Sequence, residues 1–93
     1  MEITSAKVEK YLALTQKALG KIQVNTSVKV DAKKVADDFL DMAQRYFADA
    51  KHFKEKGDLV TAFAAVNYAH AWLDAGARLG VFDVHDTELF AAD

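Results

Sequence analysis

Hydrophobic positions in the second half of the chain recur every three or four residues, which is the spacing of one side of an α-helix. The pattern is broken once, at Gly57 and Asp58. Glycine readily takes the left-handed conformation that ends a helix, and aspartate caps the start of the next one. We therefore expect two long helices, over residues 31–56 and 58–79, that run antiparallel because only a very short turn can join them. Asp31 is the expected N-cap of the first of the two.

The helix predicted over 58–79 is apolar on two sides. One face carries Leu59, Ala62, Phe63, Val66, His70, Leu73 and Ala77. A second, nearly opposite face carries Ala65, Tyr68, Trp72 and Leu79. A helix that is apolar almost all round is buried on more than one side. In a chain this short, we expect it to touch two other helices or another subunit.

The N-terminal segment predicts a further helix, over about residues 5–23, capped by Thr4 or Ser5. Its apolar stripe consists of Val8, Tyr11, Leu12, Leu19 and Ile22. Lysines occupy the outer side, so the helix could also lie on an anionic membrane surface. We predict no membrane association, because Glu9 and Gln16 dilute the charge and the stripe has a core to join.

Two segments without a helical pattern remain. Residues 24–30 are rich in valine, but no partner strand exists, so we expect an extended connector whose valines tuck against the bundle. The tail, residues 81–93, could fold back over Tyr68 and Trp72, with one turn capped by Asp86; otherwise these aromatic residues stay exposed, as in a binding surface. A mid-helix glycine at position 76 suggests close backbone packing there.

Composition narrows the class of protein. The 93 residues predict one domain, 1–93, and the hydrophobic and charged fractions of 52% and 28% are typical of a globular protein. A net charge of -2 gives no electrostatic reason to expect a nucleic-acid partner. The chain has no cysteine and no apolar run long enough to span a bilayer, so we expect a cytoplasmic protein.

Three segments carry a resemblance to a known family: Tyr46-Phe-Ala-Asp-Ala-Lys-His-Phe, Lys56-Gly-Asp and Ala62-Phe-Ala-Ala-Val-Asn-Tyr-Ala-His-Ala-Trp-Leu-Asp-Ala-Gly. Together with Glu9-Lys-Tyr-Leu, they resemble an archaeal family of short helical proteins, domain of unknown function 357. The resemblance implies an all-α, three-helix up-down-up bundle in an archaeal cytoplasmic protein. The family has no established activity, so the resemblance assigns no functional residues.

Several polar residues of the hairpin are candidates for chemistry. His70 lies within an apolar face, and Asp74 follows one helical turn later, where it could orient the imidazole as a base or ligand. The candidate ligand-binding residues are Tyr46, Asp49, Asn67, His70, Asp74 and Arg78. The alternative is a structural histidine, hydrogen-bonded by Asp74, Asp49 or a tyrosine. Asp49 is expected to be partly buried and to pair with Arg78 or His70.

Metal and cofactor sites are not predicted. His52, His70 and His85 are far apart, and no helix carries a histidine pair with ligand spacing. The acidic cluster Asp37, Asp38 and Asp41 is explained by the start of a helix, where negative charge is favoured.

Two functional hypotheses remain. The first is a non-catalytic interaction module that binds another protein or forms a homo-oligomer, a dimer. Its candidate interface residues are Phe47, Tyr68, Trp72 and Leu79. The alternative is a small-ligand-binding or catalytic bundle that uses the polar residues around His70 and Asp74.

Overall fold

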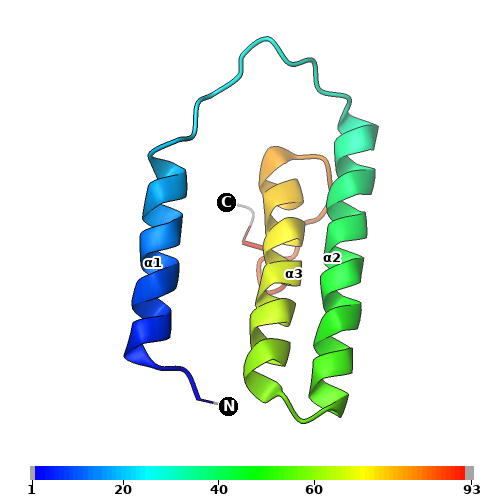
Figure 1. Cartoon of the computed structure of the whole chain (residues 1–93). Coiled ribbons are helices and arrows are strands. Elements are labelled where there is room, and N and C mark those ends of the chain that lie inside the picture. The colour runs from blue at the N-terminus through cyan, green and yellow to red at the C-terminus, as the bar shows by residue number, and fades with distance from the viewer. Residues whose placement is uncertain (1, 92–93) are drawn as a thin grey trace.

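The computed structural model describes residues 2–91 and contains three α-helices (Figure 1). They are α1 (Ser5–Leu19), α2 (Ala32–Glu55) and α3 (Leu59–Leu79). The helices run up, down and up, and no strand occurs within residues 2–91. The all-α class and the three-helix up-down-up order are therefore confirmed. No described helix is both long and apolar enough to cross a membrane.

Each helix begins at a capping side chain that the sequence singles out. The Oγ1 atom of Thr4 accepts a hydrogen bond from the backbone N–H of Lys7, and Asp31 accepts one from Lys33 N–H, at 3.1 and 3.0 Å. Asp58 caps α3 in the same way. Gly57 has a φ of 81°, a conformation that glycine adopts without strain, which lets the chain reverse between α2 and α3.

α2 and α3 pack along a seam of small residues. The most buried side chains of α2 are Ala43 and Ala50, and the buried residues of α3 are Ala62, Ala69 and Gly76. Members of each set are seven residues apart, so they recur on one side of their helix every two turns. The four buried alanines are only 4–9% exposed. Side chains this small let the two backbones approach closely.

Larger aromatic side chains border this seam on one side. Phe39 of α2 meets Trp72 of α3 edge to face, with ring centroids 5.1 Å apart. Tyr46 meets Tyr68 in the same manner at 4.4 Å. Such pairs add about 0.5–1.5 kcal/mol each beyond the area that they bury. The Tyr68 and Trp72 side of α3 is therefore part of the hairpin's own packing, because α2 meets α3 between the two predicted apolar faces rather than on the first of them.

α1 stands beside α3 without packing into the hairpin (Figure 1). Every one of its residues is exposed, so the expectation that its apolar stripe joins a core is wrong. The stripe instead faces Val60, Thr61 and Ala64 across an open space of about 640 Å³. The helix also ends at Leu19, four residues before the predicted end at Gln23, because Gly20 and the β-branched residues after it favour other conformations.

The segment between α1 and α2 is an irregular connector, as predicted. Its valines, Val24, Val28 and Val30, are exposed, contrary to the expectation that they tuck against a bundle. Val28 and Val30 line an open depression with Val35 and Phe39 at the start of α2, and α1 does not close over it.

The Asp58 cap predicts a pH dependence of stability. Hydrogen bonding from Thr61, through its side chain and then its backbone N–H, lowers the pKa of Asp58 below 3.8. A carboxyl group whose pKa is lowered by folding stabilises the fold at pH values above its pKa in the unfolded chain. This contribution is lost as the pH falls through the pKa of the group in the folded state. Asp58→Asn keeps a good cap but does not titrate. We expect the melting temperature of the wild type to fall more steeply than that of Asp58→Asn below about pH 4.

Circular dichroism melts at a series of pH values measure this difference. Asp38→Asn is the control, because it removes an exposed aspartate of α2 that caps no helix. Parallel curves for wild type and Asp58→Asn would contradict the prediction.

Candidate functional site

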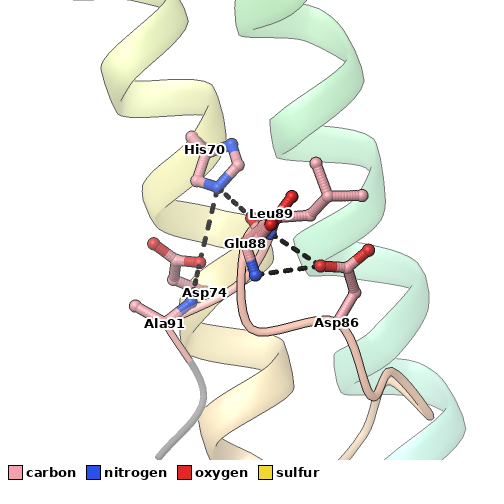
Figure 2. A network of polar contacts seen from close by, with 6 residues as sticks. All are labelled: His70, Asp74, Asp86, Glu88, Leu89 and Ala91. Atoms are coloured by element: carbon pink, nitrogen blue, oxygen red, sulfur yellow. Dashed lines mark hydrogen bonds and ion pairs between the residues drawn. The ribbon is translucent and has the colours of Figure 1, made fainter.

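His70 and Asp74 lie one turn apart on α3, and both reach the C-terminal tail (Figure 2). The Nε2 atom of His70 is 2.6 Å from the carbonyl oxygen of Leu89. Because a carbonyl oxygen can only accept, we assign the proton in this bond to Nε2. Asp74 Oδ1 accepts a hydrogen bond from the N–H of Ala91 at 2.9 Å and lies 3.5 Å from His70 Nε2. The two side chains together hold two backbone groups of the tail.

The end of the tail is shaped for this contact. The Oδ1 atom of Asp86 accepts hydrogen bonds from the N–H groups of Glu88 and Leu89, at 2.9 and 3.2 Å, which forms the predicted turn (Figure 2). The ring of Phe90 stacks on His70, with centroids 6.3 Å apart and planes 23° from parallel. The predicted turn extends to Ala92, which, like Asp93, lies outside the described residues.

The start of the tail is held by Gly76. α3 ends at Leu79 and is capped by Gly80, which has a φ of 89°. The N–H groups of Val81 and Phe82 both donate to the carbonyl oxygen of Gly76. This turn lays the Phe82 ring directly over Gly76, in space that a Cβ atom at position 76 would need. The close packing expected at this glycine is therefore against an aromatic ring. We call the whole set of contacts the tail clasp: His70, Asp74 and Gly76 with Phe82, Leu89, Phe90 and Ala91.

The tail clasp corrects one expectation. The tail lies over His70, Asp74 and Gly76, whereas the sequence suggested Tyr68 and Trp72. Those two aromatic rings pack beside α2 and leave no empty apolar face for the tail. Gly76 is the one glycine of α3, and its missing Cβ atom leaves room for the Phe82 ring against the helix.

The chemistry available at His70 is limited. Its side chain is half exposed, and its Nε2 atom is occupied by Leu89 O and lies near Asp74. Within residues 2–91, no serine, threonine or tyrosine hydroxyl makes a hydrogen bond to the imidazole. The arrangement resembles neither an activated nucleophile nor an open ligand site. It favours the structural interpretation of His70, with the tail as its partner.

The other predicted ligand-binding residues are placed elsewhere. Tyr46 and Asp49 of α2 line a shallow depression together with residues of α3, among them Tyr68, and His70 is not part of its lining. Asp49 is exposed, contrary to expectation, because α2 turns it away from the small-residue seam. Asn67 and Arg78 are exposed on α3. The structure thus brings together His70 and Asp74 and, separately, Tyr46 and Asp49.

The predicted interface residues also divide between surfaces. Tyr68 and Leu79 are about half exposed, while Trp72 is partly buried against Phe39. Phe47 lies across the seam from Tyr68, in a different groove.

Two of the three aspartates in the acidic cluster of α2 pair with bases of the same helix. Lys33 Nζ lies 2.6 Å from Asp37, and Arg45 lies 3.0 Å from Asp41, each pair one turn apart. The hydrogen bond to Asp37, together with the negative charge of that carboxylate, raises the pKa of Lys33. Among the described residues, no group of three or more potential ligands is placed to hold a metal ion.

Sequence reasoning missed the tail's side of the clasp: Phe82, Leu89, Phe90 and Ala91. Two of these residues take part through backbone atoms, which carry no sequence signal. Gly76 was the residue that could have indicated this contact. A glycine inside a helix is unfavourable unless another group packs where its side chain would be.

Comparison with known proteins identifies a family but no activity. Residues 10–82 match the family described as "Protein of unknown function (DUF357)". No curated protein and no solved structure matches the chain. The match covers all of α2 and α3, most of α1 and the tail as far as Phe82. The chain therefore belongs to the DUF357 family of proteins of unknown function.

Proposed function

We propose that this protein is a non-catalytic helical module that works by self-association. The observation that carries the proposal is the exposed apolar stripe of α1. Its members Val8, Tyr11, Leu12 and Leu19 are 47–71% exposed. An isolated helix of about 12–15 residues is marginally stable in water, so α1, with 15 residues, needs a partner surface.

The chain offers such a surface on its hairpin. The side of α3 that faces α1 carries small and apolar residues, among them Val60, Thr61 and Ala64. Tyr46 and Tyr68 continue this surface toward α2. In a dimer, α1 of one copy would cover this surface of the other copy, or the two α1 helices would share the space between them. Both arrangements bury the same stripe.

Exposed tyrosines and leucines extend this surface. Tyr68 and Leu79, two of the predicted interface residues, are 48% and 58% exposed. Large exposed apolar patches are uncommon on proteins that remain monomeric. Trp72 would contribute indirectly, because its ring packs edge to face against Tyr68, with ring centroids 6.2 Å apart.

The test is a substitution in the stripe. Leu12→Glu places a charge where the interface would exclude water and is expected to convert the dimer into a monomer. Ala13→Glu is the matched control, because it adds the same side chain to the next residue, outside the stripe. Light scattering over a concentration series gives the mass of each variant. Leu12→Glu is a cleaner probe than Trp72→Glu, which would also disturb the packing on Phe39.

A wild-type protein that stays monomeric over the whole series would contradict self-association. A dimer that survives Leu12→Glu would move the interface away from α1.

A cytoplasmic location and an archaeal source are also proposals. The first is supported by the absence of cysteine from the whole sequence, which fits a reducing compartment. The second is supported only by the resemblance of the hairpin segments to archaeal proteins.

A further inference from the structure

A second apolar groove lies on the other side of the seam, at the end of the hairpin near Gly57. Its walls are formed by Phe47, Ala50, Lys51, Lys54, Leu59, Ala62, Phe63 and Val66. We call it the lysine groove. Phe63 and Leu59 are 69% and 65% exposed, although both belong to the apolar face of α3. The groove is open to solvent and has a volume of about 410 Å³.

The charge of the groove has one sign. Lys51 and Lys54 are its only charged wall residues. The Nζ atom of Lys51 sits 4.9 Å from the centre of the Phe47 ring, which holds the ammonium group above the aromatic wall. An apolar floor with two cations at its edge complements a segment that carries apolar side chains flanked by carboxylates.

The groove adjoins the tail clasp along α3. Val66 is followed one turn later on α3 by His70, where Leu89 and Phe90 of the tail are seated. The tail clasp and the lysine groove are therefore neighbours on α3, and no described residue of the tail lines the groove.

We propose that the lysine groove binds an acidic amphipathic helix of a partner protein. The partner's apolar side chains fill the space between Phe47, Phe63 and Val66, and its carboxylates pair with Lys51 and Lys54. Open grooves between two helices commonly receive a third helix in this way. A second copy of this chain is a poorer occupant of the groove. A symmetric dimer centred on the groove would bring the lysines of both copies close together. The proposal does not depend on self-association through α1.

The probe is a pair of synthetic helical peptides of about 14 residues, or roughly four turns. Both carry Leu and Phe at every third and fourth position, and the remaining positions are Glu in one peptide and Lys in the other. The protein is the full chain labelled with ¹⁵N. We expect the Glu peptide to shift the amide signals of groove residues and to bind about tenfold more tightly than the Lys peptide at low salt.

Two variants of the protein assign the effect to the groove. The double variant Lys51→Glu/Lys54→Glu is expected to lose this preference or reverse it. Lys10→Glu/Lys17→Glu changes the total charge equally but lies on α1, and should bind like the wild type. Phe63→Glu, at an exposed position, should weaken both peptides without unfolding the protein. Leu12→Glu should leave binding unchanged, which separates this proposal from self-association.

Three results would overturn the proposal. The first is equal binding of both peptides, or binding that is insensitive to Lys51→Glu/Lys54→Glu. The second is no shift, or shifts confined to α1 or to the tail clasp. The third is a concentration-dependent change of the groove signals without peptide, which would assign the groove to a second copy of the chain.

Discussion

Ala69→Leu is expected to lower the free energy of unfolding by about 3 kcal/mol, because the added carbons have no room in the seam. Ala69 is 5% exposed and lies between Ala62 and Gly76 on the line where α3 meets α2. A leucine there would force the helices apart and open the edge-to-face contact of Tyr46 with Tyr68. Chemical denaturation followed by circular dichroism measures the loss.

Ala71→Leu is the matched control for this experiment. It makes the same change on the same helix, at an exposed position, and should alter stability by no more than about 0.5 kcal/mol. Equal stabilities of the two variants would mean that the helices separate at little cost, and that burial of large residues elsewhere maintains the hairpin.

Gly76→Ala is expected to release the whole tail while leaving the helices folded. The new Cβ atom needs the space of the Phe82 ring, so the ring must leave its place on α3. Alanine stabilises a helix by up to about 1 kcal/mol relative to glycine. This gain offsets much of the stability lost with the Phe82 packing, so the melting temperature should change little. The effect should therefore appear in the tail: the amide of Ala91, bonded to Asp74, should lose its protection from hydrogen exchange.

The same hydrogen-exchange assay, applied to a control variant, tests whether the effect is specific to position 76. Ala75→Gly is the control, because it changes an exposed neighbour in the opposite sense and leaves Gly76 intact. Retained protection of Ala91 in Gly76→Ala would mean that Phe82 is not needed to hold the tail, and that His70 and Asp74 suffice.

The hairpin could be predicted because its signals are local. Asp31, Gly57 and Asp58 each act on the backbone within three or four residues, and the structure places a cap or turn at each of them. The apolar periodicity likewise requires only one helix to be considered at a time. The start and end of α2 and α3 were consequently correct to within about one residue.

The face of α3 that packs against α2 could not be predicted from the periodicity of apolar residues. α3 is apolar over most of its surface, so the pattern does not say which part touches α2. The structure buries α3 along the line of its small residues Ala62, Ala69 and Gly76, and small size is not a signal in a pattern of apolar positions. The exposed position of α1 and the tail clasp were missed for a related reason, because both depend on contacts between segments distant in sequence.

The separation of α1 from the hairpin has a consequence for biosynthesis. α1 is completed first, and the surface beside it on α3 exists only after roughly 60 further residues have been added. At translation rates of about 5–20 residues per second, the apolar stripe of α1 waits several seconds or more without a partner in its own chain. The hairpin, whose contacts lie close in sequence, can fold as soon as α3 emerges. Neighbouring ribosomes on one message would thus present unpaired α1 helices to one another at high local concentration.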